Sequence, residues 1–131
     1  MGKLGDIVRG MYDAFGKGDV PGVLGSLDKD VHWKEAESST YSDESPYTAD
    51  TVAPRLFQRL LDDIPDFRLV PANFIEGADS VVVEGRYQGT VKGTGAKIDA
   101  QFVHVWQLRD GKVVRFQQYT DTKQWSDAMG S

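Results

Sequence analysis

The chain has 131 residues, with 15 basic and 20 acidic side chains, a formal net charge of −5 and no cysteine. This length predicts one domain over residues 1–131, large enough to bury a core without disulfides or a structural metal. The lack of cysteine excludes thiol chemistry and cysteine-ligated metals, and two histidines cannot supply a three-histidine metal site.

The acidic balance argues against a nucleic-acid partner. No segment has the ~20 apolar residues of a membrane span, and the N-terminus, with Asp6 so early, does not resemble a signal peptide. We therefore expect a cytoplasmic protein with no membrane or nucleic-acid partner.

The first part of the chain predicts two helices followed by a short strand. Apolar residues recur at helical spacing over residues 4–16, which is typical of an amphipathic helix. Asp19 is a candidate N-cap for a second, shorter helix over residues 20–27. The alternation over residues 31–35 then predicts a short strand.

Residues 36–50 separate that strand from a third helix. They are rich in Ser, Thr, Asp, Glu and Tyr and show no periodicity, so we expect an exposed loop that could act as a lid. After Asp50, apolar residues at helical spacing predict the third helix, which ends at residues 64–66.

The rest of the chain is expected to be β-structure. Strands are predicted over residues 67–75, 80–91, 98–109 and 112–122. Pro71 weakens the first of them, whereas Asp110-Gly111 is a strong signal for a two-residue hairpin turn between the last two. Such a turn would pair Leu108 with Val113, Trp106 with Arg115, His104 with Gln117 and Phe102 with Tyr119.

This order of elements predicts an α+β fold with the helices packed on one face of an antiparallel sheet. The opposite face would carry Val103, Val105, Val114 and Phe116. An uncovered face of this kind is a large apolar patch, and a symmetric homodimer is the simplest way to cover it.

Glu35 is the first candidate for chemistry, because it shares a strand face with Trp33. If that face points into a cavity, apolar surroundings would raise the pKa of the carboxyl and suit a general acid or base. The alternative is an exposed glutamate at the start of the polar loop, beside Lys34 and Glu37.

His104 is the second candidate, because it lies between Phe102 and Trp106 on one face of a strand. On an inward face it could donate a hydrogen bond to a ligand carbonyl or oxyanion. The alternative is a core histidine bonded to a neighbour such as Gln117. The other histidine, His32, alternates to the opposite face of its strand and is expected to be exposed.

Four tyrosines and one aspartate complete the candidates. Tyr12, Tyr47, Tyr87 and Tyr119 could direct their hydroxyls into a cavity. For Tyr12 and Tyr87 we expect ordinary core packing instead, whereas Tyr47 lies in the polar loop and would be at the mouth of a pocket. Asp121 could be a second acid or base, or a capping residue, and the capping role is the one we expect.

Other catalytic motifs are absent from the sequence. There is no glycine motif for phosphate or dinucleotide binding and no nucleophile elbow. Carboxylates and histidines do not cluster at metal-ligand spacing. We therefore expect neither a metal nor a cofactor.

Two segments carry a family resemblance. The first reads Met11-Tyr12-Asp13-Ala14-Phe15-x-x-Gly18-Asp19 and is followed by Asp30-Val31-x-Trp33. The second reads His104-Val105-Trp106-x-Leu108-x-Asp110-Gly111-Lys112-Val113 and is followed by Tyr119-x-Asp121-Thr122. Together they resemble SnoaL-like proteins of the nuclear-transport-factor-2-like superfamily, which includes ketosteroid isomerase and scytalone dehydratase. The superfamily hosts several activities, so the resemblance is more specific for fold than for function.

The resemblance implies a cone-shaped, strongly curved antiparallel sheet, with three helices from the N-terminal half enclosing a pocket and a homodimer formed through the sheet. Glu35 falls where ketosteroid isomerase has its general-base aspartate, and His104 where that enzyme has the protonated aspartate of its oxyanion hole. The oxyanion tyrosine of the isomerase would align with Met11, one residue before Tyr12. Asp121 is the nearest match to the acid/base aspartate of SnoaL-type polyketide cyclases. Glu35 and His104 thus replace two aspartates of the isomerase, and its tyrosine is shifted by one residue. These differences argue against a steroid isomerase.

The function we expect is therefore acid/base chemistry on an apolar small molecule, next to a carbonyl, as in a cofactor-independent isomerase, cyclase or dehydratase. Glu35 would be the base, His104 the donor to the developing enolate, and Asp121 a further candidate catalytic residue. The expected substrate-binding residues are Tyr12, Trp33, Tyr47, Phe57, Tyr87, Phe102, Trp106 and Tyr119. The alternatives are a non-catalytic binder of an apolar small molecule and a dimeric interaction module.

Overall fold

In the computed structural model, which describes residues 2–130, the amphipathic N-terminal segment forms helix α1 (Lys3–Gly16). Its apolar stripe is buried, with Val8 and Met11 fully covered. Helix α2 (Val20–Leu24) begins at the expected cap, because the Asp19 carboxylate accepts a hydrogen bond from the Gly22 N–H at 3.0 Å. It is shorter than predicted, since Leu27 already belongs to the next strand.

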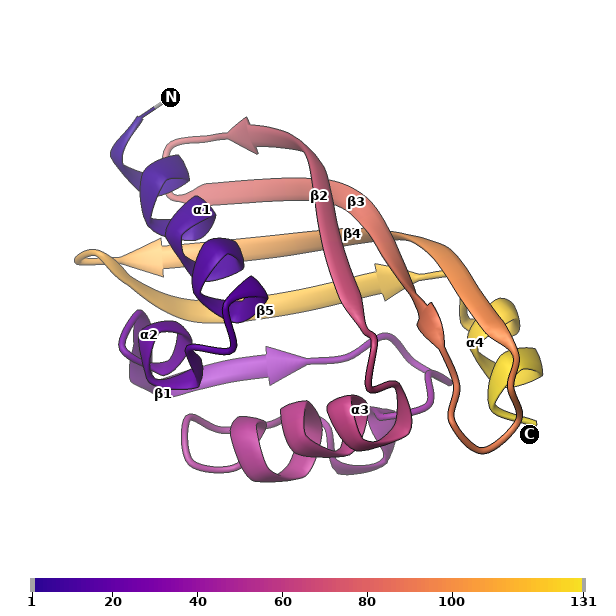
Figure 1. Ribbon diagram of the computed structural model, residues 1–131. Coiled ribbons are helices and arrows are strands. Elements are labelled where there is room, and N and C mark those ends of the chain that lie inside the picture. The colour runs from indigo at the N-terminus through magenta and orange to yellow at the C-terminus, as the bar shows by residue number, and fades with distance from the viewer. Residues whose placement is uncertain (1, 131) are drawn as a thin grey trace.

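Five strands form one curved sheet in the order β1-β5-β4-β3-β2 (Figure 1). The strands are β1 (Leu27–Lys34), β2 (Arg68–Glu76), β3 (Ser80–Thr90), β4 (Lys97–Arg109) and β5 (Lys112–Thr120). Strands β2 to β5 are antiparallel as predicted, but β1 joins β5 in parallel, so the sheet is mixed rather than wholly antiparallel. The expected α+β cone is otherwise confirmed.

A bulge in the β4–β5 hairpin changes the predicted register. The turn at Asp110-Gly111 is present, with positive φ at both residues, and Leu108 pairs with Val113 as expected. Val114 is then an extra residue, because the next pair is Gln107 with Arg115. From there the register differs by one residue from the prediction: Trp106 faces Phe116, His104 faces Gln118 and Phe102 faces Thr120.

This shift reverses the faces of the second half of β5. Phe116, predicted for the outer face, is only 2% exposed and packs inside. Tyr119, predicted for the pocket, is 54% exposed on the outside. Gln118 rather than Gln117 therefore lies on the inner face with His104.

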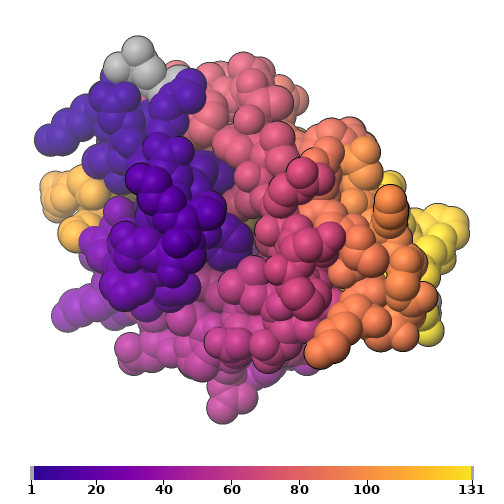
Figure 2. Space-filling model, viewed as in Figure 1, coloured from indigo at the N-terminus to yellow at the C-terminus, as the bar shows by residue number. Residues whose placement is uncertain are grey.

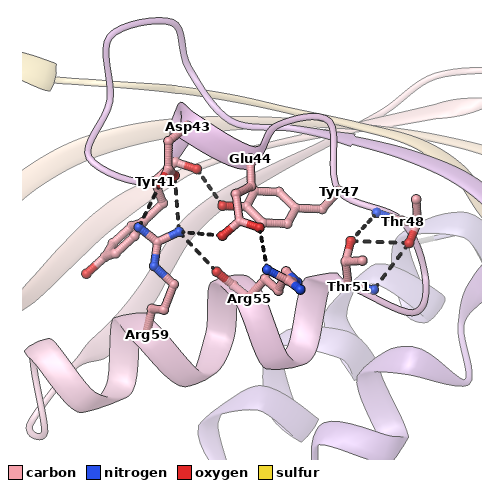
Figure 3. A network of polar contacts seen from close by, with 8 residues as sticks. All are labelled: Tyr41, Asp43, Glu44, Tyr47, Thr48, Thr51, Arg55 and Arg59. Carbon is pink, nitrogen blue, oxygen red and sulfur yellow. Dashed lines mark hydrogen bonds and ion pairs between the residues drawn. The ribbon is translucent and has the colours of Figure 1, made fainter.

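Residues 36–50 are not the freely exposed loop that their composition predicts, whereas the helix expected after Asp50 is present. A short 3₁₀ helix η1 (Ser42–Glu44) and a π-helical turn η2 (Ala53–Phe57) lead into helix α3 (Gln58–Asp63). Tyr41 and Tyr47 are buried, and Tyr47 exchanges two backbone hydrogen bonds with Trp33. Figure 3 shows the arginines of η2 and α3 reaching Asp43 and Glu44 of this segment.

Helix α4 (Thr122–Met129) follows the last strand, where the sequence patterns predict strand over residues 112–122 and no element beyond. Asp121 caps its N-terminus by accepting from the Gln124 N–H at 3.1 Å, and Gly130 ends it in the left-handed conformation. Trp125 and Ala128 are its buried face.

The helices and the concave side of the sheet enclose the core. Helix α1 packs on β2 and β3, while α4 lies beside β4 at the other end of the sheet (Figure 1). In the space-filling view, α1 and α2 cover the left of the near side and the segment around α3 covers its lower part, while strands and turns that follow α3 form the top and right (Figure 2). The inner face of β3 and β4 is thereby closed off from water.

Candidate functional site

A cavity lies between the helices and the inner face of the sheet. The volume that the centres of water-sized molecules can occupy in it is about 80 Å³. Its lining is mainly apolar side chains. Seven of the predicted site residues line it: Tyr12, Trp33, Glu35, Phe57, Tyr87, His104 and Trp106. The tertiary structure thus brings the two leading candidates, Glu35 and His104, to one cavity.

Glu35 directly follows β1 and is only 6% exposed. Its Oε2 accepts a hydrogen bond from Nε1 of Trp33 at 3.1 Å, while its backbone N–H donates to Ser45 Oγ at 3.0 Å. Its Oε1 has no hydrogen-bond partner among residues 2–130. Burial raises the pKa of this carboxyl to about 7, against the smaller lowering effect of the Trp33 bond. The carboxyl is therefore poised to exchange a proton near neutral pH.

His104 is held between two tyrosine hydroxyls. Tyr12 Oη lies 2.6 Å from Nδ1, and Tyr87 Oη lies 2.5 Å from Nε2. Burial lowers the pKa of the imidazole to about 3, so the ring is neutral near pH 7. With both nitrogens occupied, the imidazole cannot itself donate to a ligand, which corrects the role expected for it.

Proton counting shows which group is free to donate instead. Trp106 Nε1–H donates to Tyr12 Oη at 3.0 Å, and Gln118 Nε2–H donates to Tyr87 Oη at 2.8 Å. A neutral imidazole has one N–H and one bare nitrogen. One tyrosine must therefore donate to the bare nitrogen, while the other accepts from the ring N–H. The tyrosine that accepts from the ring N–H keeps its own O–H without a partner among these hydrogen bonds. Both tyrosines line the cavity.

This arrangement corrects the expectation that Tyr12 and Tyr87 would be ordinary core residues. Both are buried, but their hydroxyls form a polar chain with the histidine rather than being incidental to packing. Desolvation raises the pKa of each phenol well above its usual value, so both remain protonated donors. Tyr12 lies one residue after the position that the family resemblance assigns to an oxyanion tyrosine.

The remaining predicted residues lie outside the cavity lining. Phe102 is buried behind it and stacks on the His104 ring, with centroids 4.0 Å apart and an interplanar angle of 16°. Tyr47 is buried, and its hydroxyl donates to the Tyr41 carbonyl at 2.6 Å rather than lying at the pocket mouth. Asp121 caps α4, and Tyr119 is on the outer face.

Sequence reasoning missed several polar residues that line the cavity: Ser39, Thr40, Tyr41, Gln118, Thr120 and Trp125. Gln118 accepts from the Ala36 N–H at 3.1 Å, which orients its amide toward Tyr87. No sequence signal marks the bulge that turns it inward. Trp125 lines the cavity from α4, and here a signal existed: Asp121 and Gly130 bracket a segment of helical length.

No trio of His, Asp or Glu side chains within residues 2–130 is arranged to hold a metal ion. Within the same part of the chain, no helix combines the length and apolar character of a transmembrane span. The cavity lining carries one carboxyl, three phenols, an imidazole and further neutral hydrogen-bonding groups.

The fold and cavity define an α+β cone protein with a partly open, largely apolar pocket. The SnoaL-like domain family matches residues 8–116, so the chain belongs to this family. None of the curated proteins matches the chain significantly.

Several solved structures are similar over the whole chain. An NTF2-like protein from Burkholderia thailandensis is 27% identical, with a TM-score of 0.91 and 98% of each chain covered. An NTF2-like protein from Burkholderia pseudomallei is 29% identical, with a TM-score of 0.89 and full coverage of both chains. TerC, co-crystallised with polyporic acid, is 26% identical, with a TM-score of 0.87 and coverage of 99% of this chain and 100% of that one.

Proposed function

We propose that this protein binds an apolar small molecule bearing a carbonyl group and moves a proton at the carbon next to that carbonyl. Glu35 is the base, and the unpaired tyrosine O–H of the Tyr12–His104–Tyr87 chain is the donor to the carbonyl oxygen. The observation that carries the proposal is the free Oε1 of buried Glu35 in the same cavity as that chain.

The proposed step is balanced within the site. The C–H bond breaks, its proton moves to the Glu35 carboxylate, and its electron pair forms the carbon–carbon double bond of an enolate. The negative charge that develops on the oxygen is stabilised by the tyrosine O–H. Return of the proton from Glu35 to another carbon gives an isomerase. Transfer of that proton to a hydroxyl leaving the β-carbon releases water and gives a dehydratase.

The electrostatics of the cavity support this division of roles. With its pKa near 7, a substantial fraction of Glu35 is ionised at neutral pH, and burial favours the protonated product of the step. His104 acts through the tyrosines as a positioning residue, because a neutral ring with two bonded nitrogens orients both hydroxyls. TerC, which has a similar fold and 26% identity, was co-crystallised with polyporic acid, which supports a small-molecule ligand here.

The test is hydrogen–deuterium exchange at the acidic carbons of 2-tetralone in D₂O, followed by proton NMR. We expect the wild-type protein to accelerate exchange above the buffer rate, and Glu35→Gln to lose this acceleration by about 100-fold or more. Glu37→Gln is the matched control, since Glu37 is exposed two residues away. Exchange by Glu35→Gln at the wild-type rate would show that Glu35 is not the base.

The second candidate function is a non-catalytic binder, which the mainly apolar lining favours. Such a protein would bind 2-tetralone, with a rise in melting temperature, and leave its exchange at the buffer rate. The same experiment therefore separates the two functions.

A further inference from the structure

Three buried side-chain polar atoms in the described chain have no hydrogen-bond partner: Ser39 Oγ, Thr40 Oγ1 and Trp125 Nε1. All three residues line the same cavity. Buried polar groups in folded proteins are nearly always paired, because leaving one unpaired costs its full desolvation energy. That all three belong to residues lining one cavity indicates that a bound molecule completes their hydrogen bonds.

Trp125 differs in this respect from the other two tryptophans of the chain. Nε1 of Trp33 donates to Glu35, and Nε1 of Trp106 donates to Tyr12. Trp125 is just as buried, with 4% of its surface exposed, yet its indole N–H has no acceptor. An indole N–H can only donate, so the group that it lacks is an acceptor.

Trp125 enters the cavity from α4, and its ring links that helix to the segment of Ser39 and Thr40. The Trp125 ring packs edge-on against Tyr87, with centroids 5.5 Å apart, and against Tyr41 at 6.2 Å. Ser39 and Thr40 immediately precede Tyr41 in the chain. The Tyr12–His104–Tyr87 chain supplies the other donor and is built from α1, β4 and β3. A ligand in the cavity therefore meets donors from several separate elements of the fold.

We propose that Trp125 Nε1, Ser39 Oγ and Thr40 Oγ1 form a second ligand subsite, which takes an acceptor oxygen of the ligand. This inference rests on the proposed function for the carbonyl end of the ligand. It makes the ligand class more specific: an apolar ring system that carries a ketone at one position and a second acceptor oxygen (a carbonyl, an ether or a hydroxyl) at another. Trp125 is a specificity-determining residue in this assignment.

The indole N–H signals of the three tryptophans provide the test, in ¹H–¹⁵N spectra of the full chain. The probes are 2-tetralone, its 5-, 6- and 7-methoxy derivatives, and the corresponding ethyl derivatives as controls of similar size without oxygen. The signals of Trp33 and Trp106 report that the cavity is occupied. We expect at least one methoxy isomer to shift the Trp125 signal downfield, as a new hydrogen bond does, and 2-tetralone and the ethyl series to leave it nearly in place.

A variant with 3-benzothienylalanine at position 125 keeps the ring size and removes only the N–H. In the wild type, the responding methoxy isomer should bind about tenfold more tightly than 2-tetralone, and this advantage should disappear in the variant. Trp125→Phe assigns the NMR signal, and a normal melting temperature of the benzothienyl variant shows that it is folded.

The proposal is overturned if the Trp125 signal stays in place with every methoxy isomer, or if the ethyl derivatives shift it equally. It is also overturned if the benzothienyl variant keeps the affinity advantage. None of these readouts depends on proton exchange. If Glu35 is not the base, the second subsite therefore still stands. If the second subsite is absent, the proposed role of Glu35 is unaffected.

Discussion

The hydroxyl of Tyr12 lies 2.6 Å from Nδ1 of His104, although 92 residues separate the two in the chain. Helix α1 brings the phenol to the inner face of β4, where Tyr87 from β3 contacts the other ring nitrogen. The result is a buried chain of neutral hydrogen bonds on one wall of a cavity that also contains a carboxyl with a raised pKa.

The first prediction is that His104 does not titrate near neutral pH. Burial lowers the pKa of its ring to about 3, and the charged ring would have to donate to both tyrosines at once. In ¹⁵N spectra of the histidine side chains, the His104 signals should stay constant between pH 5 and 8, with the exposed His32 as reference. A His104 titration with its midpoint inside that range would contradict the structure.

The second prediction concerns the tyrosine hydroxyls. Tyr12→Phe leaves the Trp106 N–H and one nitrogen of His104 without a partner in a buried setting. We expect the free energy of unfolding to fall by about 1–3 kcal/mol, measured by urea denaturation. Tyr119→Phe is the control, because Tyr119 is 54% exposed and should change stability by less than ~0.5 kcal/mol. Equal stability of the two variants would argue against the buried chain of bonds.

The third prediction is the pH dependence of stability due to Glu35. The folded pKa of about 7 lies above the ordinary value of 4.5, so the folded state binds this proton more tightly than the unfolded state. The contribution of Glu35 to stability is therefore fully present below about pH 4.5 and is lost as the pH rises to about 7. Above that range the buried charge costs about 3 kcal/mol.

Glu35→Gln removes this titration. Relative to wild type, the variant should gain up to about 3 kcal/mol as the pH rises from 4.5 to above 7. Denaturation midpoints measured across this range for both proteins provide the test. Burial lowers the pKa of His104, so the contribution of His104 to stability changes with pH in the opposite direction, over an overlapping pH range. This contribution is the same in both proteins and cancels in the difference between them. Parallel curves for the two proteins would mean that Glu35 has an ordinary pKa.

The fourth prediction concerns the segment over residues 36–50, which is held by Arg59. The Arg59 guanidinium bonds to Asp43 at 3.1 Å and to Glu44 at 3.3 Å, and it lies 5.1 Å above the Tyr41 ring (Figure 3). Arg59→Ala should speed hydrogen exchange of the Tyr47 N–H, which donates to the Trp33 carbonyl at 2.7 Å. Global stability should change by less than ~1 kcal/mol, since these ion pairs are partly exposed.

Arg55→Ala is the matched control for this effect. Arg55 makes a single ion pair with Glu44 at 3.0 Å and its side chain is 60% exposed. Its removal should affect Tyr47 exchange much less than removal of Arg59. Equal protection in both variants would show that the segment is held by Tyr41 and Tyr47 packing alone.

The fifth prediction is that the protein forms a homodimer through the outer face of the sheet. Tyr119 is 54% exposed there, opposite the half-buried Val103. Analytical ultracentrifugation should give twice the chain mass, and Tyr119→Lys should shift the equilibrium toward the monomer. A wild-type protein that sediments as a monomer at high concentration would contradict the prediction.

Local patterns in the sequence were sufficient for most of the elements. Helical spacing predicted α1, the Asp19 cap predicted the start of α2, and Asp110-Gly111 predicted the last hairpin. The family resemblance of its motifs was sufficient for the α+β cone and for choosing Glu35 and His104. These features depend on residues that are neighbours in the sequence, or on short motifs that can be recognised in the sequence alone.

The bulge at Val114 could not be predicted in this way. Side chains in a strand alternate with a period of two, so one extra residue reverses every face beyond it. This single residue turned Phe116 and Gln118 inward and Tyr119 outward, and it accounts for three differences between prediction and structure.

By itself, then, the sequence determined the class of fold, the apolar character of the pocket and the two groups most suited to its chemistry. Only the tertiary structure decided what those groups do. It buried Glu35 enough to raise its pKa, placed His104 between two phenols so that we propose a tyrosine as the donor, and left the indole N–H of Trp125 without a partner. The reason is physical: desolvation and hydrogen-bond partners come from residues distant in the chain, and no local pattern records which of them will meet.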